Sequence, residues 1–251
     1  MSCCPPGSLP ALLAESDYKP VGTATEVAGA QLYTVGSDKS KALVIITDIF
    51  GSDSGRHKAI ADSFAERGFT VVLVDGTVGK PIDPNDNIGE KIGPFALSHR
   101  WAEELAPVFT QAVLPHLKSL GFDKFATLGF CYGVWVQFKA LNDAAVAPHI
   151  VAQVCPHPSI QLEGFHGGKG PELAGKITCP TLLLPARNDP DFVQSGGAVE
   201  KDLHKRGVVC ETHVFDQPHG FFVRGDVKSD AVRADVDKAF QLSLEFLQKH
   251  M

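Results

Sequence analysis

The sequence predicts an α/β protein with a mostly parallel sheet of seven or eight strands and helices on both faces. Short apolar runs alternate with segments of helical period along the chain. Several of these runs are apolar throughout, which is typical of strands buried on both faces. Such alternation favours a parallel sheet covered by helices. Because the 251 residues contain no internal repeat or linker, we expect a single domain over residues 1–251, with residues 1–17 as a peripheral tail.

The expected elements are separated by Gly, Pro and Asp residues, which favour turns and the ends of helices and strands. The strand-like runs are apolar and short, and they cover residues 41–50, 69–75, 124–130, 150–155, 180–186 and 208–215. The segments with helical period cover residues 56–66, 98–120, 132–142, 198–206 and 229–249. Pro107 and Pro115 are expected to kink or divide the second of these segments. Residues 76–94 are rich in Gly, Pro, Asn and Asp, so we expect a long surface loop there. Ligands of such sheets bind at the carboxyl ends of the strands, and functional residues are expected at those ends.

Composition and charge exclude several classes of function. The formal charge is 23 − 29 = −6, which disfavours nucleic acid as a partner. No apolar run approaches 18 residues, so no membrane span is expected. Six cysteines are too few for a disulfide scaffold, and they indicate reduced thiols and a cytoplasmic location. The N-terminal residues show no targeting segment, and no long apolar stripe is legible, so we expect a monomer.

No cofactor or metal ion is expected from the motifs. The chain lacks a phosphate-binding loop, a dinucleotide fingerprint and an H-E-x-x-H sequence. Cys3 and Cys4 are adjacent, but a metal site would need two more ligands that their neighbourhood in the sequence lacks. His157 and His166 flank a Gly-rich segment and are interpreted as residues near the site rather than as ligands.

A nucleophile motif follows the run 124–130. The pentapeptide Gly129-Phe130-Cys131-Tyr132-Gly133 fits G-x-nucleophile-x-G with cysteine in place of the usual serine. The glycines are needed because the turn is strained and its neighbours pack closely. The turn would hold the sulfur at a helix N-terminus, where positive potential favours the thiolate.

An acid and a base follow two later strand ends. Asp189 and Asp191 come after the run 180–186, and Asp189 is favoured because it is nearer the strand end. His219 stands in a Pro/Gly loop after the run 208–215. The order Cys131, Asp189, His219 is the nucleophile–acid–base order of α/β hydrolases, so the three residues are predicted to form a catalytic triad.

The chain resembles the dienelactone hydrolase (carboxymethylenebutenolidase) family of the α/β-hydrolase fold. The matching stretches are Asp48-Ile49-Phe50-Gly51, Gly129-Phe130-Cys131-Tyr132-Gly133, Asp189, His219-Gly220-Phe221 and Arg224, so the resemblance covers most of the chain. The Cys3-Cys4 and Cys155-Pro156-His157-Pro158 sequences look like those of eukaryotic-type members. The resemblance implies thiolate-based hydrolysis of small carboxylic esters or lactones. The backbone N–H groups of Ile49 and Tyr132 would bind the oxyanion.

Other site residues are implied with less support. The family has Glu at the position of Asp48, and that Glu is thought to hold the resting thiol. Asp48 is one methylene shorter, so the contact with the thiol is either retained with a shift in position or lost. Arg224 is a candidate for binding a substrate carboxylate, and Phe95 and Phe221 are candidates for lining an apolar pocket. Two alternatives to a hydrolase stay open. One is a catalytically silent binding protein, and the other is a redox-responsive thiol protein, for which the sequence shows no C-x-x-C.

Overall fold

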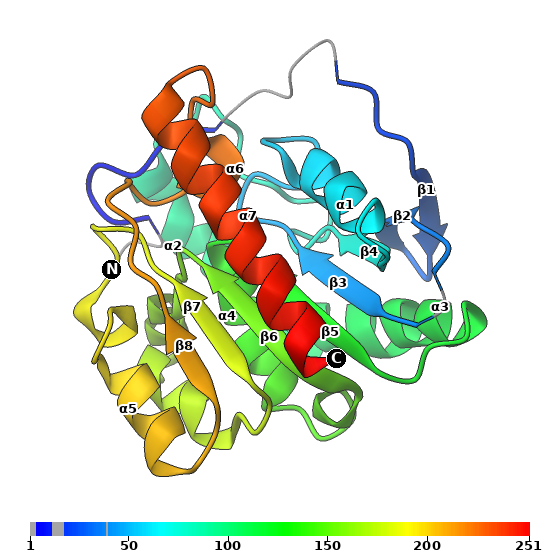
Figure 1. Cartoon of the computed structure of the whole chain (residues 1–251). Coiled ribbons are helices and arrows are strands. Elements are labelled where there is room, and N and C mark those ends of the chain that lie inside the picture. Colours follow the sequence, from blue (N-terminus) through cyan, green and yellow to red (C-terminus); the bar gives the residue numbers. More distant parts are fainter. Residues whose placement is uncertain (1–3, 12–17, 39) are drawn as a thin grey trace.

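An eight-stranded sheet runs through the molecule in the order β1-β2-β4-β3-β5-β6-β7-β8 (Figure 1). The computed structural model describes residues 4–11, 18–38 and 40–251. The strands are β1 (Thr23–Val27), β2 (Ala30–Val35), β3 (Ala42–Ile46), β4 (Thr70–Val74), β5 (Phe125–Gly129), β6 (Ile150–Pro156), β7 (Thr181–Leu184) and β8 (Cys210–Thr212). β2 is antiparallel to both β1 and β4, and the other pairs are parallel. The predicted α/β fold with a mostly parallel sheet is confirmed.

Helices cover both faces of the sheet (Figure 1). The α-helices are α1 (His57–Ala65), α2 (Ile88–Ser98), α3 (Leu114–Ser119), α4 (Tyr132–Leu141), α5 (Ala198–Lys205), α6 (Phe221–Arg224) and α7 (Asp230–His250). Two π-helical segments, Trp101–Leu105 and Val108–Val113, lie between α2 and α3. Short 3₁₀ segments span Ala147–His149, Ile160–His166, Gly170–Lys176 and Asp191–Val193.

Two apolar cores, one on each face, hold the helices to the sheet. All five residues of β3 have no solvent exposure. Leu43 and Ile45 point into the core shared with α1 and α7, whereas Val44 and Ile46 point into the core shared with α2 and α4. Successive side chains of a strand alternate between faces, so an uninterrupted apolar run supplies both cores at once.

Two expectations about the elements differ from the structure. The β1–β2 hairpin lies at the sheet edge, and because β1 is polar and exposed, its pattern gave no strand signal. The predicted loop over 76–94 is wrong from Ile88 onward, where α2 begins after an Asn87 side-chain cap at Gly89 N. The long helix predicted over 98–120 is divided into two π-helical segments and α3, in agreement with the division expected at Pro107 and Pro115.

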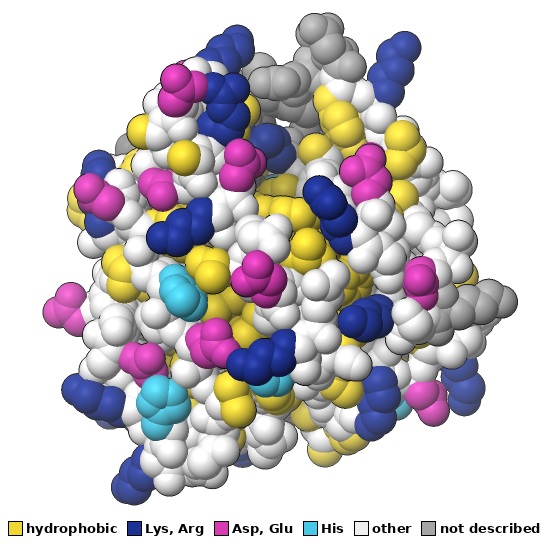
Figure 2. All heavy atoms as spheres, viewed as in Figure 1, with side chains coloured by type: hydrophobic (Ala, Val, Ile, Leu, Met, Phe, Trp, Pro, Cys, Tyr) yellow, Lys and Arg dark blue, Asp and Glu magenta, His cyan; other side chains and the backbone are white. Residues whose placement is uncertain are grey.

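The surface shows mixed charge. On the face that carries α7, charged side chains of both signs are scattered among apolar ones (Figure 2). Within residues 4–11, 18–38 and 40–251, no helix combines the length and the apolar character needed to cross a bilayer.

Candidate active site

Cys131 occupies a strained turn between β5 and α4. Its backbone has φ 55° and ψ −112°, which is unfavourable for a residue with a side chain. The turn is held by hydrogen bonds from Cys131 N to the carbonyl oxygen of Pro156 (3.3 Å) and from Ser159 N to the carbonyl oxygen of Cys131 (3.1 Å). The Ser159 hydroxyl lies 3.3 Å from the Cys131 sulfur. The surrounding structure therefore fixes the strained residue and its thiol.

The two glycines of the motif are required by close backbone contacts. A Cβ atom on Gly129 would lie 2.4 Å from the carbonyl oxygen of Gly133. A Cβ atom on Gly133 would lie 2.5 Å from the carbonyl oxygen of Ile46 in β3. Both distances are far below van der Waals contact, so only glycine lets the turn close and lets α4 start this near the sheet.

Asp189 and His219 form a buried pair at the ends of two neighbouring strands. The Asp189 Oδ1 atom lies 2.6 Å from Nδ1 of His219, and neither side chain is exposed. The other carboxylate oxygen of Asp189 accepts a hydrogen bond from Ala186 N (2.7 Å). The backbone N–H of His219 donates to the Asn188 side chain (2.7 Å). The imidazole is thus fixed in tautomer and orientation, whereas Asp191 is exposed at the start of a 3₁₀ segment.

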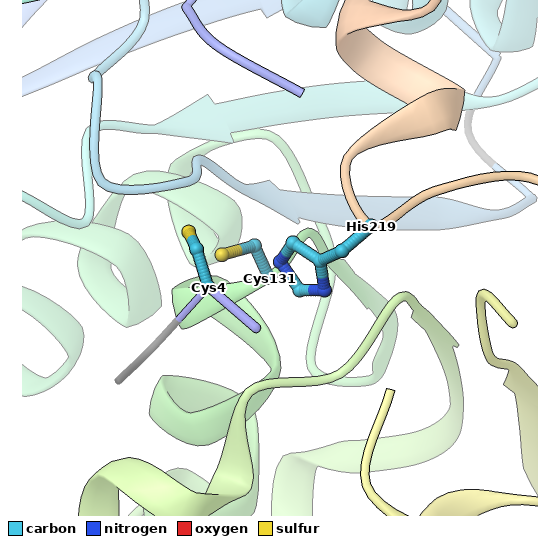
Figure 3. Close-up of side chains that lie close together, drawn as sticks. All are labelled: Cys4, Cys131 and His219. Atoms are coloured by element: carbon cyan, nitrogen blue, oxygen red, sulfur yellow. The ribbon is translucent and has the colours of Figure 1, made fainter. Parts of the chain in front are cut away.

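The structure brings the three predicted residues together. A ring nitrogen of His219 and the sulfur atoms of Cys131 and Cys4 all lie within 4.8 Å of one another. Figure 3 shows the His219 ring beside the Cys131 sulfur, with Cys4 on the other side of that sulfur. Because Nδ1 is engaged by Asp189, Nε2 is the nitrogen that remains for the thiol.

The electrostatics of the site favour a protonated imidazole. Burial lowers the pKa of His219, but the negative charges of Cys131 and Asp189 outweigh it and raise the pKa well above its ordinary value. Asp189 supplies one negative neighbour of the imidazole, and a Cys131 thiolate would supply the second.

His157 lies beside His219, in agreement with its interpretation as a residue near the site. It is fully buried, has φ 36°, and its ring centroid lies 5.0 Å from that of His219. Burial, and then the charge on His219, hold its pKa well below the ordinary value for histidine. His157 is therefore neutral and packs against the imidazole. His166 lies elsewhere, stacked on Trp135 at 5.0 Å.

Asp48 pairs with Arg224 in the interior. Its Oδ2 atom accepts a hydrogen bond from Nη1 of Arg224 (2.6 Å), and its Oδ1 atom accepts one from Phe50 N (3.0 Å). Both side chains of the ion pair have no exposure. The guanidinium also lies 5.1 Å from the centre of the Phe50 ring. This placement gives Asp48 a cationic partner, and the binding of a substrate carboxylate by Arg224 stays a prediction.

The remaining predicted residues fall on different sides of the sheet. Ile49 is fully buried after β3, and Tyr132 is the first residue of α4, directly after Cys131. Phe95 of α2 packs 5.0 Å from the Tyr132 ring, in the same core as Cys131. Phe221 lies in the other core, 4.8 Å from the Phe215 ring, and is fully buried. This placement makes Phe221 a packing residue and argues against the pocket-lining role.

The N-terminal residues 4–11 contact the site, so the prediction of a peripheral tail is wrong for them. Leu9 N donates to the carbonyl oxygen of His219 (2.9 Å). The Asn188 side chain donates to the carbonyl oxygen of Pro6 (3.0 Å). Cys4 is 7% exposed and its sulfur lies beside that of Cys131. Residues 1–3, with Cys3, and residues 12–17 lie outside the described residues.

The site is closed to solvent in this conformation. Neither Cys131 nor His219 has any exposure. A cavity of about 430 Å³ does open at the surface near Phe50 and Asp75, but neither Cys131 nor His219 lines it. A substrate must therefore displace part of the cover to reach the thiol, and residues 4–11 are one part of that cover.

The sheet order, the strained nucleophile turn and the nucleophile–acid–base order define the α/β-hydrolase fold. A family model for the dienelactone hydrolase family matches residues 29–251. The chain therefore belongs to the dienelactone hydrolase family, which places it among the carboxylic ester hydrolases.

Individual relatives cover nearly the whole chain. A hydrolase named pyvD from Aspergillus violaceofuscus is 24% identical over 99% of this chain and 96% of its own length. A human carboxymethylenebutenolidase homolog is 27% identical over 94% of each chain. Esterase 2 of Thermogutta terrifontis, a solved structure, superposes with a TM-score of 0.62 at 17% identity, covering 94% of this chain and 97% of that one. The last of these comparisons supports the fold.

Proposed function

We propose that the protein hydrolyses small carboxylic esters or lactones with a Cys131–His219–Asp189 triad through a covalent thioester. The observation that carries the proposal is the arrangement of these three residues. The thiol stands on a strained turn at a helix N-terminus, an imidazole nitrogen lies within 4.8 Å of it, and a carboxylate lies 2.6 Å from the other nitrogen. This arrangement supports the roles of nucleophile, base and orienting group in acyl transfer.

The proposed reaction has two halves. The Cys131 sulfur attacks the carbonyl carbon, and the oxyanion that forms accepts hydrogen bonds from the backbone N–H groups of Ile49 and Tyr132. The C–O bond to the leaving group breaks, and His219 gives its proton to the departing oxygen. His219 then takes a proton from water, whose oxygen attacks the thioester. The carboxylic acid leaves, and the thiolate is restored.

The nucleophile favours activated substrates. A thiolate is a better leaving group than an alkoxide, so the tetrahedral adduct of an alkyl ester mostly returns to the starting ester. An enol or aryl oxygen leaves more easily, and an enol lactone supplies such an oxygen within a ring. The dienelactone hydrolase family model and the carboxymethylenebutenolidase homologs support this substrate class for the present chain.

We extend the proposal to the setting of the enzyme. In the part of the chain that the structure describes, Cys155, Cys179 and Cys210 are in no disulfide, which supports a reducing, cytoplasmic compartment. The large apolar side chains that are exposed, Val21, Leu97, Val209 and Val214, are few, which supports a monomer. The negative net charge supports a small-molecule partner over nucleic acid.

A series of acetate esters with graded leaving groups tests the substrate class. We expect kcat/KM to rise from alkyl through phenyl to nitrophenyl and enol esters more steeply than the rate of hydroxide-catalysed hydrolysis of the same esters. The reason is that expulsion of the leaving group must compete with expulsion of the thiolate. The hydroxide rates are the control for intrinsic reactivity. Equal slopes for enzyme and hydroxide, or turnover of amides as fast as of phenyl esters, would contradict the proposal.

A further inference from the structure

Three side chains of metal-binding types lie close together at Cys131, although they are far from one another in the sequence. The sulfur atoms of Cys4 and Cys131 and a ring nitrogen of His219 lie within 4.8 Å of one another, and all three residues are buried (Figure 3). We propose that Cys4, Cys131 and His219 form a site for a thiophilic divalent ion such as Zn²⁺. We propose further that the bound ion inhibits the hydrolase, a consequence that rests on the function proposed above.

The donor set and its spacing fit such an ion. Two thiolates and one imidazole are ligands that Zn²⁺ takes readily, with bonds of about 2.3 Å to sulfur and about 2.0 Å to nitrogen. A tetrahedral ion with these bonds holds its ligand atoms about 3.5 to 3.8 Å apart. The three atoms are already within 4.8 Å, so side-chain rotations of about 1 Å complete the site.

The hydrogen bond between Asp189 and His219 also suits a metal ion. Asp189 binds Nδ1 of His219, so Nε2 is the ligand atom, and the carboxylate raises its basicity. A carboxylate behind a histidine is the usual support of a zinc ligand. Two thiolates and a neutral imidazole also balance the double positive charge, so the ion with its three ligands is electrically neutral.

The other described cysteines do not compete well. Burial raises the pKa of the Cys179 and Cys210 thiols to about 12. Metal binding requires a thiolate, so these two thiols bind metal poorly at neutral pH. Both lie near Cys155 and away from the site, so single substitutions of Cys179 and Cys210 serve as matched controls.

A bound ion would close the site in two ways. It would occupy the sulfur that attacks the ester and the nitrogen that moves the proton. It would also tie residues 4–11 to the nucleophile, where Leu9 N already bonds to the His219 carbonyl oxygen. Three protein ligands leave a fourth position of the tetrahedron for water or a small anion.

The test uses the full-length, untagged protein with a phosphine reductant, so that no disulfide can form. Co²⁺ is titrated as the spectroscopic probe. We expect one equivalent to give a near-ultraviolet thiolate-to-cobalt absorption band. The Cys4→Ser variant should lose about half of the band and bind at least about tenfold more weakly, because one of three ligands is gone. Cys4→Ala is the second variant, and Cys179→Ser and Cys210→Ser should match the wild type.

Inhibition is measured on the same set of proteins. We expect Zn²⁺ to inhibit turnover of a nitrophenyl ester, with a midpoint at least about tenfold higher in Cys4→Ser than in wild type, and a chelator to restore activity. Absence of the cobalt band, or equal affinities in wild type and Cys4→Ser, would overturn the site. A normal band in a protein that hydrolyses no ester would leave the site standing and contradict the proposed hydrolase. A protein that hydrolyses the ester but gives no cobalt band would contradict the metal site and leave the proposed hydrolase standing.

Discussion

Cys131→Ala is expected to lower kcat/KM for an activated ester by about 10⁴-fold or more, since removal of the nucleophile from a triad costs on this scale. The thiol is fully buried but small, so its removal leaves little cavity and the fold should persist. Steady-state rates measure kcat/KM, and thermal melting of the same preparation shows whether the fold persists. Cys179→Ala is the matched control: it also removes one thiol, and it should keep wild-type kcat/KM.

His219→Ala should lose nearly as much activity as Cys131→Ala, and the double variant little more than either one. The reason is that residues acting as a unit are strongly non-additive, because the thiol is ineffective without its base. Additive losses, or Cys131→Ala with more than about a tenth of wild-type activity, would show that these side chains do not act together on the ester.

Arg224→Met is expected to lower the free energy of unfolding by about 3 to 5 kcal/mol. The guanidinium and the Asp48 carboxylate are 2.6 Å apart with no exposure, so removal of the cation leaves a buried, unpaired negative charge. Urea unfolding followed by circular dichroism measures the change. The control is Arg233→Met, which breaks an exposed ion pair with Asp230 and should cost no more than about 1 kcal/mol.

A double variant separates this pairing from simple packing. Asp48→Asn with Arg224→Met should be more stable than the sum of the two single losses predicts, because the second change removes the stranded charge. A loss below about 1 kcal/mol in Arg224→Met, or strict additivity in the double variant, would contradict the buried ion pair as a stabilising contact.

The parts of the site that could be predicted are those set by local sequence. The turn at Cys131 needs glycine on both sides, and the sequence displays both glycines. Asp189 and His219 each follow an apolar strand, and parallel strands bring their carboxyl ends to one edge. The order of the three residues along the chain then indicates their partnership. The fold class and the candidate triad could therefore be predicted from the sequence alone.

The parts that could not be predicted depend on long-range packing. Nothing near Cys4 shows that residues 4–11 fold back over His219, because the contact is a backbone bond from Leu9 and a side-chain bond from Asn188. The sequence therefore assigns Cys4 to a peripheral tail and does not predict that its thiol lies beside Cys131.

The same limit applies to Asp48 and Arg224. They are 176 positions apart, and each alone was open to a role with substrate or thiol. Only the fold shows that their charges meet. The β1–β2 hairpin was not predicted for a different reason. An exposed, polar edge strand such as β1 shows little alternation of apolar and polar residues.

The most direct test of the central claim is to trap the acyl group on Cys131. Wild-type protein is mixed with a nitrophenyl ester, quenched in acid before the steady state, and measured by intact mass spectrometry and peptide mapping. We predict one added acyl group per chain, located on Cys131, removed by neutral hydroxylamine and absent from Cys131→Ala. Full turnover without any adduct at early times, or an adduct on another residue that survives in Cys131→Ala, would contradict the thioester mechanism.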